Sequence, residues 1–118
     1  MKTLIAAAFA LIPSMGLTQA ATTALGADLR VLDKLNGIVT DVSLRTGETA
    51  TLGHLQVNLK ECRFPRDNPN GDAFAELLVM YRDNEAPAFE GWLIASAPAL
   101  NAMEHPRYDV WVLRCIRS

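Results

Sequence analysis

The sequence has 118 residues, half of them hydrophobic, with 11 basic and 13 acidic side chains. Its formal charge of −2, with both signs mixed along the chain, excludes the basic footprint that nonspecific nucleic-acid binding requires. A chain of this length builds one small domain with a modest core, which a covalent crosslink would stabilise.

The first twenty residues have the three-part layout of a secretory signal. A basic start precedes the unbroken apolar run of residues 4–12, and small residues stand one and three positions before a cleavage site between Ala20 and Ala21. A membrane anchor needs about 20 apolar residues, and Pro13 interrupts this run. The pattern therefore predicts a signal peptide over residues 1–20 and a periplasmic mature protein that does not span the membrane.

The mature chain alternates between apolar segments and turn signals. Residues 21–27 are small and weakly patterned, which predicts a flexible leader, and residues 28–118 are expected to form a single domain. The segment 73–81 contains good helix formers, but the turn signals on both sides of it favour a strand. Period-two alternation or short apolar runs bounded by Gly, Asn and Pro predict strands, at residues 28–32, 37–44, 49–52, 55–60, 73–81, 89–95 and 108–116.

The end of the chain contains a connection and a last strand. A short helical turn is predicted near residues 97–103, with Ser96 as its cap, because Pro98 suits the first turn of a helix. The strand 108–116 is apolar on both faces, which predicts a central strand with Trp111 in the core. The expected fold is all-β: a small barrel or sandwich of five to seven short strands.

The two cysteines of the sequence, Cys62 and Cys115, are predicted to form one disulfide. An exported protein enters an oxidising compartment, and only one pairing is possible within the chain. Strict alternation from Leu55 would place Cys62 on the polar face of its strand, although a disulfide should point inward. Either a bulge near Glu61 shifts the register, or the strand ends there.

Residues with catalytic or metal-binding potential are few. Ser96, His105 and Asp109 are the residue types of a hydrolase triad, but no G-x-S-x-G nucleophile elbow is present. His54, His105 and Glu104 lack the spacing of a zinc site. The sequence therefore predicts no cofactor and no metal, and it favours a non-catalytic protein over an enzyme.

A binding surface is the preferred functional hypothesis. The connection between the last two strands is too long for a simple hairpin loop, and long structured connections on a β scaffold often carry function. Trp92, Ser96, His105 and Tyr108 lie on or beside this connection and are the candidate binding residues. The alternative is a small periplasmic hydrolase or ligand-binding protein that uses the region around His105.

The sequence also resembles an alphaproteobacterial family of exported proteins catalogued as domain of unknown function 2155. Besides both cysteines, three segments carry the resemblance: VLDKLNG at residues 31–37, FEGWLIASAPAL at 89–100 and MEHPRYDVWVL at 103–113. The family has no agreed activity or catalytic residues to carry over. Its genes often neighbour one for an accessory subunit of respiratory complex I, so the resemblance weakly implies an envelope or inner-membrane protein partner, respiratory in kind.

Overall fold

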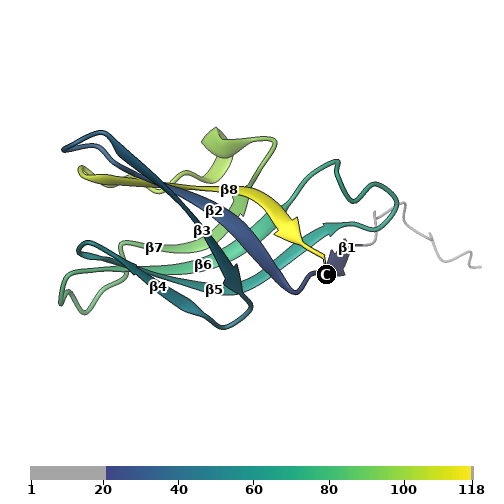
Figure 1. Ribbon diagram of the computed structural model, residues 1–118, viewed down its shortest axis with the longest axis horizontal. Helices are drawn as coiled ribbons and strands as arrows, with labels where there is room; N and C mark the ends of the chain where they lie inside the picture. Colours follow the sequence, from purple (N-terminus) through teal and green to yellow (C-terminus); the bar gives the residue numbers. More distant parts are fainter. Residues whose placement is uncertain (1–20, 118) are drawn as a thin grey trace, which may run out of the picture.

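The computed structural model describes residues 21–117, where all regular structure is β-strand except one 3-10 turn. The predicted signal peptide, residues 1–20, lies outside the described residues. The eight described strands form two antiparallel sheets that face each other, as the two layers of Figure 1 show. The expected all-β fold is therefore confirmed, and its form is a sandwich.

The two sheets differ in size. In the large sheet the strand order is β1, β5, β6, β7. β4 also belongs to this sheet and pairs with β5 on the same side as β1 does, at the other end of β5. In the small sheet the order is β3, β2, β8. The strands of the large sheet are β1 (Ala21–Thr23), β4 (Thr49–Leu52), β5 (Leu55–Pro65), β6 (Phe74–Tyr81) and β7 (Phe89–Ile94). Those of the small sheet are β2 (Gly26–Asp33), β3 (Ile38–Arg45) and β8 (Tyr108–Ile116).

The expected strand over residues 73–81 is confirmed as β6, but the expectation of a flexible leader is wrong. Ala21–Thr23 form β1, which pairs with β5, and Gly26 and Ala27 are the first residues of β2. Ala27 is fully buried, and a Cβ on Gly26 would overlap the carbonyl oxygen of Leu44. Small side chains are present here because neighbouring strands approach closely, which a hydrophobicity pattern does not reveal.

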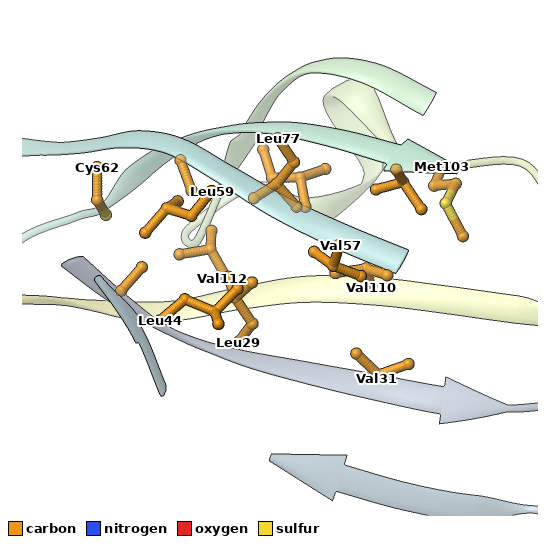
Figure 2. Close-up of a cluster of buried hydrophobic side chains, with 14 of the residues drawn as sticks. Leu29, Val31, Leu44, Val57, Leu59, Cys62, Leu77, Met103, Val110 and Val112 are labelled. Carbon is orange, nitrogen blue, oxygen red and sulfur yellow. The ribbon is translucent and has the colours of Figure 1, made fainter. Parts of the chain in front are cut away.

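Alternation along the strands builds the core between the sheets. The inward residues of β2, β5, β6 and β8 are buried, and Figure 2 shows their side chains pointing toward one another from the two layers. Met103, from the connection after β7, is also part of this cluster. Each fully buried aliphatic side chain stabilises the fold by about 1.5–3 kcal/mol relative to an exposed one. The largest fully buried residues are Leu29, Leu55, Val57, Leu59, Cys62, Leu77 and Val79.

Two β-bulges turn the cysteines inward. In β5 the register with β6 shifts between Leu59 and Glu61, and in β8 the register with β2 shifts at Leu113. Each extra residue reverses the alternation, so Cys62 of the large sheet meets Cys115 of the small sheet, with 5.7 Å between their Cα atoms. The predicted disulfide is confirmed, and the bulge, rather than a strand end, explains the position of Cys62.

The last strand differs from its prediction. β8 lies at an edge of the small sheet rather than at its centre, and it buries Val110 and Val112 on its inner face. Trp111 points away from that face, is only half-buried and does not belong to the core cluster. Apolar residues occur on the outer face of β8 where another segment of the chain partly covers it, because Ala95 and Pro98 line a hollow there together with Trp111 and Leu113.

Candidate functional site

The segment that covers β8 is the connection between β7 and β8, residues 95–107. It contains the predicted helical turn, a 3-10 turn at Pro98–Asn101 labelled η1. In Figure 1 the connection leaves the layer of β7 and reaches that of β8, so it bridges the two sheets. Its shape is set by polar contacts at its beginning, middle and end.

The beginning of the connection is held by Asp72. The backbone N–H and the hydroxyl of Ser96 donate hydrogen bonds to the Asp72 carboxylate, at 3.0 and 2.6 Å. Partial burial opposes ionisation of this carboxyl, but the hydrogen bonds from Ser96 and Ala73 outweigh it and lower the pKa of Asp72. Ser96 therefore binds Asp72 instead of capping η1, which has no side-chain cap, and the predicted capping role is wrong.

The middle of the connection closes the edge of β7. The side-chain amide of Asn101 donates a 2.6 Å hydrogen bond to the backbone carbonyl of Trp92 in β7. An edge strand exposes unpaired backbone groups that can recruit another chain. Asn101 satisfies one of these groups and places η1 against β7.

The end of the connection is organised around His105. Its Nδ1 atom accepts hydrogen bonds from the backbone N–H groups of Arg107 and Tyr108, at 3.0 and 3.2 Å. The ring packs on Tyr81, with 4.5 Å between the ring centroids. Burial, assisted by the positive charge of Lys34, lowers the pKa of His105. A neutral ring is required here because only an unprotonated Nδ1 can accept these hydrogen bonds.

An ion pair joins this end of the connection to the β2–β3 hairpin. The Arg107 guanidinium donates two hydrogen bonds to the Asp33 carboxylate, at 3.1 and 3.0 Å, and this pairing lowers the pKa of Asp33 although burial opposes it. The Lys34 ammonium donates a 2.7 Å hydrogen bond to the carbonyl of His105. The planar two-point contact of an arginine with a carboxylate fixes orientation as well as distance. The connection is thus held at both ends by side chains from other elements.

The state of His105 predicts a pH dependence of stability. The pKa of His105 is lowered in the folded chain, so stability from this residue is present above pH 6.5 and is lost as pH falls through the folded pKa. In the natural protein, the urea concentration at the midpoint of unfolding should decrease as the pH is lowered from 7 to 5. His105→Asn keeps a hydrogen-bond acceptor but cannot titrate, so its midpoint should change less over this range. Equal changes in both proteins would contradict the assignment.

Between the connection and β8 lies an apolar groove with a volume of about 320 Å³. Asp109 is the one charged group among the residues that line it, and it lies 3.6 Å from the Lys34 ammonium. Leu100 projects from η1 beside the groove with 74% of its surface exposed. Trp111 and Pro98 also line a second hollow on the outer face of β8. The groove is lined by Leu93, Ile94, Pro98, Ala99, Ala102, Met103, Asp109, Val110, Trp111 and Val112.

The structure brings together only two of the four predicted binding residues. The rings of His105 and Tyr108 lie 6.0 Å apart, but Tyr108 is buried, with its hydroxyl near the backbone N–H of His54. Trp92 lies beside Phe74 on the outer face of the large sheet, outside the groove. The predicted residues mostly brace the connection, whereas Trp111, expected in the core, lines its surface.

Ser96 and His105 lie at opposite ends of β6, which excludes a shared catalytic role. Ser96 binds Asp72, next to the start of β6, and His105 packs on Tyr81 at its end. Seven residue steps along a strand span about 23 Å. The sequence signal for the groove residues was present in the apolar outer face of β8, because an edge strand with two apolar faces requires a covering segment.

Two further features are absent from residues 21–117, the part of the chain that the structure describes. Their His, Cys, Asp and Glu side chains form no group of three or more that could hold a metal ion. Their helical content includes no segment with the length and apolar character needed to cross a bilayer.

Comparison with known proteins identifies relatives of unknown function. A family model described as "Uncharacterized protein conserved in bacteria (DUF2155)" matches residues 27–115. The "Uncharacterized protein RP359" of Rickettsia prowazekii (strain Madrid E) is 28% identical over 87 residues, which cover 71% of this chain. The match spans 56% of that relative's length, so the chain corresponds to little more than half of it. No solved structure matches.

Proposed function

The chain belongs to the DUF2155 family of uncharacterized bacterial proteins. We propose that it is an exported, non-catalytic protein-binding module. Two observations support export: the signal-peptide pattern of residues 1–20 and a disulfide, which persists in oxidising compartments such as the periplasm. The proposed partner is a protein of the cell envelope.

The groove beside β8 is the observation that carries the binding role. Its lining is apolar except for Asp109 and includes the half-buried Trp111, and it lies against a connection that is braced at both ends. Leu100, which is 74% exposed, follows the lining residue Ala99 on that connection. A rigid apolar site costs little ordering entropy on binding, and tryptophan is enriched among residues that dominate interface energies. The occupant that fits is a partner segment that inserts bulky apolar side chains between η1 and Trp111.

The alternative is a small apolar ligand in the same groove. Its volume of about 320 Å³ lies at the lower end of the range of roughly 300–1,000 Å³ that is common for ligand pockets. A ligand without a protein partner would leave cross-linking unaffected by changes in the groove. The hydrolase alternative has less support because Ser96 and His105 are both engaged in separate hydrogen bonds.

A pair of tryptophan variants tests the binding role. A tagged protein would be cross-linked in intact cells and purified from the envelope fraction, and its stoichiometric partner identified by mass spectrometry. Trp111→Ala should reduce recovery of that partner at least about tenfold, the usual scale for a central interface tryptophan. Trp92→Ala is the matched control, because it removes a half-buried tryptophan outside the groove.

The opposite result would place the binding site outside the groove. Loss of the partner in Trp92→Ala with retention in Trp111→Ala would reject the groove and support the surface predicted around Trp92. Fractionation of the same cells tests export: recovery of the protein in the periplasm with Ala21 as its first residue is expected. Recovery in the cytoplasm at full length would contradict it.

A further inference from the structure

The two cysteines of the disulfide differ in their access to solvent. Cys62 has no exposed surface, and its strand β5 is paired on both sides, with β6 and with β1. Cys115 is half-buried and is the penultimate residue of β8, which lies at an edge of the small sheet. A reagent dissolved in water therefore approaches this bond from the side of Cys115.

A hollow with a volume of about 380 Å³ lies beside Cys115. It is formed by the end of β8, the loop between β5 and β6, and the first two residues of the β7–β8 connection. Cys115 is among the residues that line this hollow, whereas Cys62 is not. The Cys115 hollow shares no lining residue with the groove beside β8, so the two are separate features of the surface.

Charged groups of both signs line the Cys115 hollow. Asp72 contributes a carboxylate, and Arg117 contributes an exposed guanidinium that donates a 3.5 Å hydrogen bond to Asn70. Arg114 also lines the hollow, but it is paired with Asp28 at 2.7 Å. The volume lies in the range of roughly 300–1,000 Å³ that is common for small-molecule sites. The hollow therefore suits a small molecule that carries both an ammonium and a carboxylate group.

We propose that Cys115 is a site of thiol–disulfide exchange in the folded protein, and that its reactant is a small polar thiol. The thiolate of the small molecule attacks Sγ of Cys115, and a new S–S bond forms between them. The bond from Cys115 to Cys62 breaks, and Cys62 leaves with the electron pair as a thiolate. One disulfide replaces another, so the step requires no further oxidant or reductant.

Access selects the sulfur that is attacked, and burial limits the lifetime of the product. Exchange depends on which sulfur a thiolate can reach, and Cys62 is completely enclosed by the core. A thiolate is unfavourable in an apolar interior, so Cys62 is expected to attack Cys115 again and to release the small thiol. The covalent link between β5 and β8 would thus open and close without unfolding of the chain.

Reduced glutathione is the probe, because it is a small thiol with an ammonium and two carboxylates. The oxidised natural protein would be mixed with it, quenched with acid at intervals, and alkylated with N-ethylmaleimide in urea. Peptide mass spectrometry should then find glutathione on Cys115 and the maleimide on Cys62. The rate should not change with urea below the unfolding transition, because the reaction takes place in the folded chain.

A pair of tryptophan variants tests whether the Cys115 hollow is the route. Asn70→Trp places a bulky side chain at an exposed position that lines the hollow, and it should slow opening of the disulfide several-fold. Asn84→Trp is the matched control, because Asn84 is equally classed as exposed but lies beyond the other end of β6. Both variants should unfold at nearly the same temperature as the natural protein, since both positions are on the surface.

Three outcomes would overturn the proposal. One is glutathione on Cys62, or divided evenly between the two cysteines. Another is a rate that rises with urea in proportion to the unfolded fraction, which would place the reaction in the unfolded chain. The third is equal rates of opening in the Asn70→Trp and Asn84→Trp variants. None of these results bears on the Trp111→Ala experiment, so the two proposals fail separately.

Discussion

Replacement of both cysteines, in the double variant Cys62→Ala and Cys115→Ala, is expected to lower the free energy of unfolding by about 4 kcal/mol. The bond joins residues 53 positions apart, so its loss restores many conformations to the unfolded chain. It also removes the covalent link between β5 of the large sheet and β8 of the small sheet. Small domains are stabilised by only about 5–15 kcal/mol, so this is a large share.

Urea unfolding of the oxidised natural protein and the double variant measures this loss. Alanine is preferred to serine because Cys62 is completely buried, and a hydroxyl there would lack a partner. The natural protein treated with a reducing agent should unfold at a midpoint close to that of the variant. A difference under about 1 kcal/mol would show that the unfolded chain gains little freedom when the bond is lost.

Leu77→Ala in β6 is expected to cost about 2–5 kcal/mol, because it leaves a cavity between the sheets. Leu77 has no exposed surface and contacts the core cluster. Its neighbour Leu78 points to the outer face of the same strand and is only half-buried. Leu78→Ala makes the identical chemical change and should cost about 1 kcal/mol, the scale typical of substitutions outside the core.

The two leucine variants can be compared by chemical unfolding at a single pH. A difference between them of about 1 kcal/mol or more would support the inward direction of Leu77. Equal losses would contradict the alternation of β6, and with it the register that places Leu77 opposite Leu59. The comparison isolates the direction of the side chain, because Leu77 and Leu78 are adjacent residues of the same strand and undergo the same substitution.

In the β7–β8 connection, different residues hold the segment in place and form its apolar surface, a distinction that the sequence did not reveal. Ser96, Asn101 and His105 use their polar atoms to hold the connection against the sheets. The apolar surface beside them is formed by their neighbours, which include the exposed Leu100 and the half-buried Trp111. Residues with catalytic potential thus serve here as local hydrogen-bonding partners, which explains why their side-chain types alone suggested a hydrolase.

Local pattern was sufficient to predict most of the strands and the disulfide. Period-two alternation in residues 55–59 identified the inner face of β5, since a pleated strand directs successive side chains to opposite sides. The turn signals around residues 73–81 identified β6 although its composition suits a helix. The pairing of Cys62 with Cys115 followed from their number and the expected compartment.

Tertiary structure alone decided which faces of these strands meet other parts of the chain. The sequence showed that β8 is apolar on both sides, but whether a second sheet or a connection covers Trp111 depends on contacts between distant residues. The same reason applies to Ala24, Gly26 and Ala27, which neighbouring strands bury, and to the ion pair of Asp33 and Arg107. Alternation is a property of one strand, whereas the position of a strand in its sheet is a property of the whole fold.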